Sequence, residues 1–185
     1  HVHQGLKKAL QSLQREFKIK YVKVTLPEEK AYLFKTEVEG ETDEDLRTSI
    51  EFHLEENVPI SGEEAVFDYF VFKNKDSTHR EASVTVFPKN IINNYISLLK
   101  ECDLVPLSFH LEPTAISRAL VNDGDPSTYI IVNLGDTKTG ISVESEGGLQ
   151  FTSTVQIGSE SFNEAIAKQF NVSKEEAEKI KKEKG

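Results

Sequence analysis

Apolar residues near the N-terminus recur at the spacing of a helix and then give way to strand-like stretches. One face of the predicted helix, over residues 5–17, carries four apolar side chains: Leu6, Leu10, Leu13 and Phe17. Residues three and four positions apart lie on the same side of a helix, so this spacing predicts an amphipathic one. Residues 20–26 are rich in β-branched side chains and are followed by Pro27, which predicts a strand.

The next stretch predicts a small antiparallel α+β module. We expect, in order, a strand over 31–38, a helix over 42–57, and strands over 65–73 and 81–87 joined by a polar turn at 73–80. Thr42 stands three residues before Asp45, which is the spacing of a helix cap. Pro59 follows the helix and cannot continue it.

The second half of the chain alternates helices and strands. We expect a helix from Pro88 to about Cys102, a strand over 104–111, a helix over 114–121, strands over 129–134, 140–145 and 149–156, and helices over 161–170 and from 173 onward. The apolar run over 129–134 predicts a strand buried on both faces. Glu146-Gly147-Gly148 predicts a hairpin turn. Two capping boxes are expected before the last helices: Ser161 with Glu164, and Ser173 with Glu176.

Composition and charge exclude several classes of function. The chain has 22 Lys and Arg against 31 Asp and Glu, a net charge of −9, which argues against a nucleic-acid partner. Cys102 is the single cysteine, so neither an intrachain disulfide nor a Cys-rich zinc site can form, and the histidines lack zinc-ligand spacing. No stretch approaches the roughly 20 apolar residues that span a bilayer. The chain has no methionine, and we expect it to be a piece of a longer protein.

The stretch from Ile131 to Gly140 is the first candidate for chemistry. A strand ends in a turn rich in glycine and hydroxyl side chains, where Gly135 lets the backbone approach closely. Successive backbone amides, with the hydroxyls of Thr137 and Thr139, can converge on an anion such as phosphate. The alternative is an ordinary hairpin turn, since glycine, aspartate and threonine are common turn residues.

Glu112, at a strand-to-helix junction, is the second candidate. A carboxylate there can orient a water molecule or a metal-bound water. The alternative is simple electrostatics, because an acidic side chain is favourable near any helix N-terminus.

The order of these segments resembles the actin-like ATPase superfamily. Glu112-Pro113-Thr114-Ala115 is similar to the connecting segment of the 70-kDa heat-shock chaperones, and residues 133–139 are similar to the superfamily's second phosphate loop. The resemblance implies that ATP is bound by Gly135, Asp136, Thr137, Lys138, Thr139 and Gly158. It also implies Glu112 as a catalytic residue and Asn133, where an acidic residue is usual, as a contact of Mg²⁺ through water.

The inserted module resembles that of the branch containing FtsA and the PilM family of type IV pilus assembly proteins. Three stretches are similar to PilM: a Glu-rich helix ending in Val58-Pro59-Ile60, then Asp68-Tyr69, then residues 98–106. The implied fold class is α/β, a partial actin-like (ribonuclease H-like) ATPase fold with an inserted strand-helix-strand-strand α+β module. The implied subdomains are a remnant of the first over 1–30, the module over 31–88, a return to the first over 89–126, and the start of the second over 127–185.

The resemblance implies a cytoplasmic adaptor peripheral to the bacterial inner membrane. It would bind the cytoplasmic tail of a PilN-like inner-membrane protein and meet the membrane only through that partner. Val58, Pro59 and Ile60 are candidate partner contacts; alternatively they only close the core of the module. ATP and Mg²⁺ are expected in the full-length protein and neither in this chain.

Two further functions stay open. One is an FtsA-like cell-division protein that assembles into filaments and tethers them to membrane, and the other is an actin-like ATPase enzyme. A chain that lacks core strands should also expose apolar strand edges, which tend to pair with other chains, so self-association is possible whichever function holds.

Overall fold

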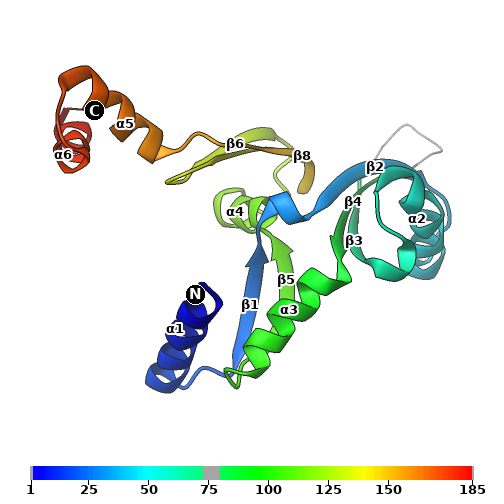
Figure 1. The fold of residues 1–185 in the computed structure, drawn as a ribbon. Helices are drawn as coiled ribbons and strands as arrows, with labels where there is room; N and C mark the ends of the chain where they lie inside the picture. The colour runs from blue at the N-terminus through cyan, green and yellow to red at the C-terminus, as the bar shows by residue number, and fades with distance from the viewer. Residues whose placement is uncertain (1, 73–79, 185) are drawn as a thin grey trace.

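The computed structural model describes residues 2–72 and 80–184 (Figure 1). The helices are α1 (Val2–Phe17), α2 (Asp43–Asn57), α3 (Lys89–Lys100), α4 (Glu112–Leu120), α5 (Ser159–Phe170) and α6 (Lys174–Lys184), with short 3-10 helices η1 (Glu28–Lys30) and η2 (Gly62–Glu64). The strands are β1 (Tyr21–Leu26), β2 (Tyr32–Val38), β3 (Ala65–Val71), β4 (Arg80–Pro88), β5 (Val105–Leu111), β6 (Thr128–Leu134), β7 (Thr139–Ser145) and β8 (Gly148–Val155). Among these residues the strands form three sheets, ordered β1-β5, β2-β4-β3 and β6-β7-β8.

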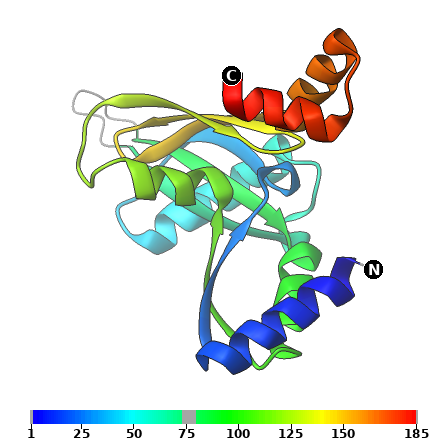
Figure 2. The ribbon, with the colours of Figure 1, turned by 90° about the vertical axis from the view of Figure 1, so that its left-hand side faces the viewer.

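The first sheet pairs β1 with β5 in parallel, from Tyr21 with Val105 to Leu26 with Leu111. Parallel strands need a long crossover connection, and here it contains the whole inserted module together with α3. The helices α1 and α3 lie beside this sheet (Figure 2). Leu10 of α1 packs on a buried cluster at the end of α3: Leu98, Leu99, Cys102 and Leu104. Lys7 of α1 also forms an ion pair with Glu101, which follows α3. Cys102 follows α3, which ends at Lys100, and is buried.

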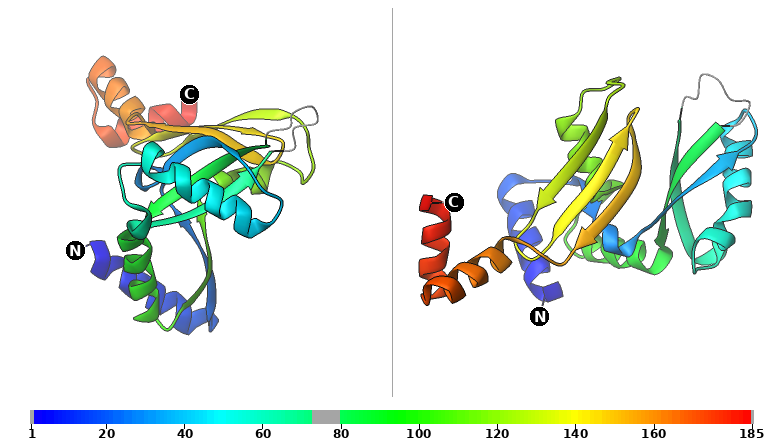
Figure 3. Two further views of the ribbon diagram at one scale, coloured as in Figure 1. Left: turned by 90° about the vertical axis from the view of Figure 1, so that its right-hand side faces the viewer. Right: turned by 90° about the horizontal axis from the view of Figure 1, so that it is seen from above.

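The module consists of the antiparallel sheet β2-β4-β3 with α2 on one face (Figure 3). The helix starts as the sequence predicts: Asp45 N–H donates to the Thr42 hydroxyl, and the Thr42 amide donates to the Asp45 carboxylate. Its buried face meets the sheet in a hydrophobic core: Val38, Leu46, Ile50, Leu54, Val58, Ala65, Ala82, Val84 and Val86. The strand-helix-strand-strand prediction is therefore confirmed, while the polar turn predicted at 73–80 lies mostly outside the described residues.

The third sheet, β6-β7-β8, is an antiparallel meander whose last turn contains Glu146 and Gly147 at positive φ. The prediction that the strand over 129–134 is buried on both faces is wrong. Ile130, Val132 and Leu134 are 71%, 62% and 54% exposed. These side chains lie on one face of β6, and this face stays open to solvent among the described residues.

The last two helices extend away from the three sheets (Figures 1 and 3). The capping box predicted from Ser173 and Glu176 is confirmed at the start of α6. The box predicted from Ser161 and Glu164 is wrong, because α5 begins two residues earlier, after Gly158, without a side-chain cap. No described helix combines the length and the apolar character that crossing a bilayer requires.

The three sheets meet at one buried cluster. Leu26, Phe87, Leu111 and Leu149 come from β1, β4, β5 and β8 respectively. Leu111 is followed directly by α4, whose N-terminal turn contains Pro113, where the missing N–H of proline costs little. This helix therefore starts at the junction of all three sheets.

Candidate functional site

The turn between β6 and β7 is tight and packs against the start of α5. The Gly135 amide donates to the Lys138 carbonyl at 2.9 Å, which closes the turn. The carbonyls of Gly135 and Asp136 accept from the first amides of α5, those of Ser159 at 2.9 Å and Glu160 at 2.8 Å. The turn thus satisfies helix-end amides that an anion would otherwise contact.

Gly158 lies against this turn, as the predicted site requires. A Cβ added to Gly158 would stand 2.5 Å from the carbonyl carbon of Asp136 and 2.7 Å from the amide nitrogen of Lys138. Such distances are far inside van der Waals contact, so only glycine allows the two backbones to approach this closely. The Thr139 hydroxyl also joins the two segments, donating to the Ile157 carbonyl at 2.6 Å.

Lys138 is paired with Glu29 of η1, a residue that no sequence motif singled out. Their hydrogen bond raises the pKa of the Lys138 ammonium and lowers the pKa of the Glu29 carboxyl. Asp136 accepts from the Ser159 hydroxyl at 3.0 Å, and Thr137 is exposed.

Glu112 and Asn133 are brought together, although 21 positions separate them in the chain. The Asn133 amide donates to Glu112 Oε1 at 3.3 Å. Both residues line a pocket between α4 and the third sheet, together with Glu28, Gly135, Lys138 and Thr154, among others. Glu28 is buried and accepts hydrogen bonds from the hydroxyls of Thr152 and Thr154.

Several donors at the turn are already bonded within the chain. The Lys138 ammonium and the Thr139 hydroxyl are already bound to groups of the chain, as are the first amides of α5. Two carboxylates, Glu28 and Glu112, line the same space and would repel an anion. Phosphate binding by the turn residues and Gly158 stays a prediction.

Glu28, which lines this pocket, and Glu29, which pairs with its residue Lys138, are two acidic residues that sequence reasoning missed. They follow Pro27 in the short helix η1, far from the Gly/Thr turn along the chain. Their sequence context contains no motif, and only the contact of η1 with β8 brings them to the pocket.

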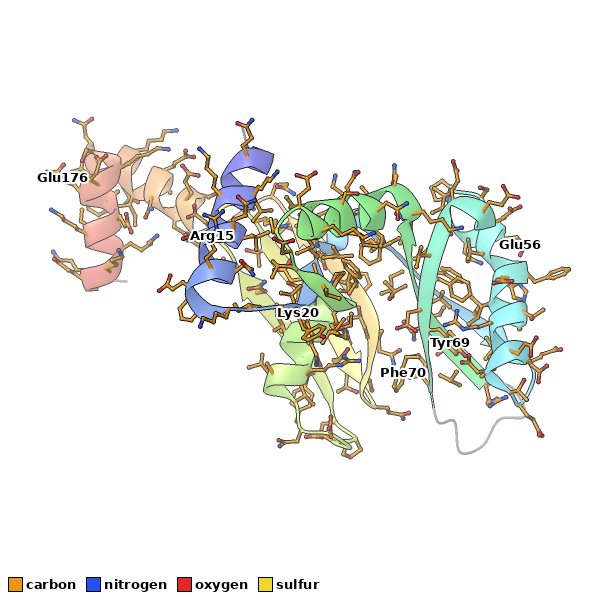
Figure 4. The ribbon with its side chains drawn as sticks, turned by 90° about the horizontal axis from the view of Figure 1, so that it is seen from below. Arg15, Lys20, Glu56, Tyr69, Phe70 and Glu176 are labelled. Carbon is orange, nitrogen blue, oxygen red and sulfur yellow. The ribbon has the colours of Figure 1, made fainter. Side chains whose placement is uncertain are left out.

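A second concavity lies between the module and the remainder of the chain. The groove is lined by β3 and β4 on the module side and by β5, α4 and the β7–β8 turn on the other: Val66, Phe67, Asp68, Tyr69, Phe70, Ser83, Thr85, Phe87, Ile92, Phe109, His110, Leu111, Thr114, Arg118, Gly147, Gly148 and Leu149. Side chains alternate along β3, so Phe70 points to the side of the groove and Tyr69 to the side of α2 (Figure 4).

The core-side wall of the groove contains a polar cluster. Arg118 of α4 lies 3.2 Å from His110 Nδ1, and the other ring nitrogen of His110 lies 2.8 Å from the Ser108 hydroxyl. Burial and the nearby positive charge of Arg118 lower the pKa of His110. Arg118 therefore supplies positive charge to the groove, which Asp68 of β3 also lines.

The predicted partner contacts lie outside this groove. Val58 belongs to the buried core of the module, and Ile60 packs against that core. Pro59 is the exposed member of the three. Val58 and Ile60 thus help to close the core of the module. A partner-binding role for the turn stays a prediction.

Residues 1–185 match the model of a protein family that is described as "Type IV pilus assembly protein PilM". The chain belongs to the PilM family. A comparison with curated proteins gave no match.

Solved structures give the PilM-family chain an actin-like ATPase fold. The PilM-PilN type IV pilus biogenesis complex matches with a TM-score of 0.75 and 18% identity, over 97% of this chain and 56% of that one. The cytoplasmic domain of EpsL, from the type II secretion system of Vibrio cholerae, matches with a TM-score of 0.56 and 16% identity, over 81% of this chain and 56% of that one. MreB5 of Spiroplasma citri bound to ADP matches with a TM-score of 0.51 and 13% identity, over 97% of this chain and 40% of that one. The chain thus spans about half of these proteins, and its fold is a partial one.

Proposed function

We propose that this PilM-family chain is the part of a type IV pilus adaptor that binds the cytoplasmic tail of a PilN-like inner-membrane protein. The tail would lie in the groove between the module and β5 with α4. The observation that carries the proposal is the groove itself, a concavity whose lining includes Val66, Phe70 and Arg118. A similar chain is known in a PilM-PilN complex, which supports the choice of partner.

The groove suits an extended peptide for two reasons. Val66 and Phe70 face it and are 42% and 38% exposed, so a partner can still bury apolar surface there. In addition, β3 is an edge strand, and its unpaired backbone groups can bind another extended segment. In this proposal the protein is cytoplasmic and reaches the inner membrane through its partner alone.

Binding of a fluorescein-labelled synthetic tail of the PilN-like protein from the same organism tests the proposal. We expect saturable binding in fluorescence anisotropy, weakened about tenfold or more by Val66→Asp, because an unpaired charge would be buried in the interface. Val105→Asp is the matched control, since both valines are 42% exposed and Val105 lies outside the groove. Equal affinity of the two variants, or no binding by the wild type, would contradict the proposal.

We further propose that ATP and Mg²⁺ belong to the full-length protein and that this chain alone binds neither usefully. The support is the set of internal bonds made by Lys138 and Thr139, together with the carboxylates that line the pocket. In the full-length protein, donors from the remaining half of the fold would have to supply the phosphate contacts. Micromolar ATP binding by this chain in calorimetry would overturn this second proposal.

A further inference from the structure

The charge of the chain is concentrated in the inserted module. Residues 31–88 contain 14 Asp and Glu against 5 Lys and Arg, so their net charge equals the −9 of the whole chain. The helix α2 contributes most, with 6 acidic residues and one arginine in Asp43–Asn57. A surface with this charge attracts a basic partner and raises the rate of encounter with it.

The outer face of α2 combines this charge with an exposed aromatic ring. Phe52 is 84% exposed, the highest value among the large apolar side chains of the described residues. Glu51, Glu55 and Glu56 stand beside it on the same helix and are also exposed. An aromatic ring inside a rim of charged residues is typical of a contact that another protein covers.

The opposite charge is found on α1 and the start of β1. Residues 5–23 contain six Lys and Arg and a single acidic residue, Glu16. Lys8 and Arg15 are exposed on the helix, and neither forms an ion pair within 2–72 and 80–184. Figure 4 places Arg15 and Glu56 on different sides of the molecule, so the two surfaces cannot meet within one chain.

We propose that α2 of one copy docks on α1 of a second copy, with Phe52 against Arg15 and the glutamates beside Lys8 and Arg15. Complementary charge argues for a second copy, because each surface finds its counterpart in the same sequence. A guanidinium over an aromatic face adds a cation–π contact. An anionic bilayer would attract α1 but would leave the acidic outer face of α2 without a counterpart.

This contact is heterologous, since two different surfaces meet. Such a contact repeats from copy to copy unless the rotation closes a ring, and it therefore builds chains or rings. It uses none of the groove residues, so it is independent of the proposed partner binding.

Sedimentation velocity of the wild-type chain over a range of concentrations tests the contact. We expect association that grows with concentration at low ionic strength and weakens strongly near about 0.5 M salt, where the screening length falls to a few ångströms. Two reversal variants separate the surfaces: Lys8→Glu with Arg15→Glu on α1, and Glu51→Lys with Glu55→Lys on α2. Each should lower the association constant about tenfold or more, and a 1:1 mixture of the two should restore it, because each surface then meets its complement.

The matched control is Lys168→Glu with Lys179→Glu. Both lysines are exposed, on α5 and α6, and the change should leave association unchanged. Circular dichroism melting confirms that every variant folds. A wild-type chain that stays monomeric at low salt would overturn the proposal, and so would a mixture that fails to restore association. Vesicles of phosphatidylglycerol are tested in parallel: sedimentation of a monomeric chain with them, lost in the α1 variant, would assign α1 to the bilayer and overturn the proposal.

Discussion

The hydroxyl of Ser83 in β4 donates a 2.6 Å hydrogen bond to the carbonyl of Leu149 in β8, and both residues are buried. This bond joins the inserted module to the third sheet at the floor of the groove. The adjacent Gly148 makes room for the contact, since a Cβ there would stand 2.6 Å from Phe70. The module is thus held by its two chain connections, to β1 and to α3, and again through β8.

Removing the Ser83 hydroxyl should weaken this attachment. Ser83→Ala leaves the Leu149 carbonyl buried without its donor, and we expect the free energy of unfolding in urea to fall by about 1–3 kcal/mol. Ser153→Ala, at an exposed position of β8, serves as the control and should change it by less than about 0.5 kcal/mol. Equal effects of the two changes would show that the hydroxyl contributes nothing specific.

Gly158→Ala should destabilise the chain through a backbone clash. The new methyl group would stand 2.5 Å from the Asp136 carbonyl carbon and force the β6–β7 turn away from α5. We expect a loss of about 1–3 kcal/mol in urea unfolding, the usual cost of overpacking. Gly62→Ala is the matched control, because a Cβ at Gly62 meets nothing within 4 Å. A Gly158 variant as stable as the Gly62 variant would refute the close approach.

Thr42→Ala removes the cap of α2. The Thr42 hydroxyl accepts from the Asp45 amide at 3.1 Å, and its loss should lower the stability of the chain by about 1 kcal/mol. Thr48→Ala makes the same change inside the same helix, where alanine is favoured, and should be neutral or slightly stabilising. Thermal melting of the two variants measures the difference, and a reversed order would mean that the cap is not formed in solution.

Glu144 should make stability depend on pH. Its side chain is 4% exposed with one carboxylate oxygen unpaired, and burial raises the pKa of Glu144 above its ordinary value of 4.5. At a pH between 4.5 and the raised pKa, Glu144 is protonated in the native state and ionised in the unfolded state. The free energy of unfolding therefore falls as pH rises through this window.

The variant Glu144→Gln cannot ionise, and it should therefore become more stable relative to the wild type as pH rises from 4 to 8. Urea unfolding at several pH values measures this difference. Glu146→Gln, at the exposed hairpin turn, is the control for the loss of one carboxylate. A constant difference between wild type and Glu144→Gln across the range would mean that Glu144 ionises normally.

The sequence predicted those parts of the site that lie close together along the chain. The Gly135–Lys138 turn and the cap at Thr42 depend on contacts within a few residues, which local patterns report. Glu112 and Asn133 lie 21 positions apart, and only their order in a recognisable fold placed both of them at one site.

The tertiary structure alone decided what covers each element. The run over 129–134 has the composition of a buried strand, yet Ile130 is 71% exposed because no described segment packs on that face. The same applies in reverse to Glu28, an acidic residue that is buried because β8 supplies two hydroxyl donors. Periodicity and caps determine where helices and strands form, since these depend on neighbours in the chain. Burial, the groove and the pairing of distant charges depend on which surfaces meet, and that is decided only when the whole chain packs.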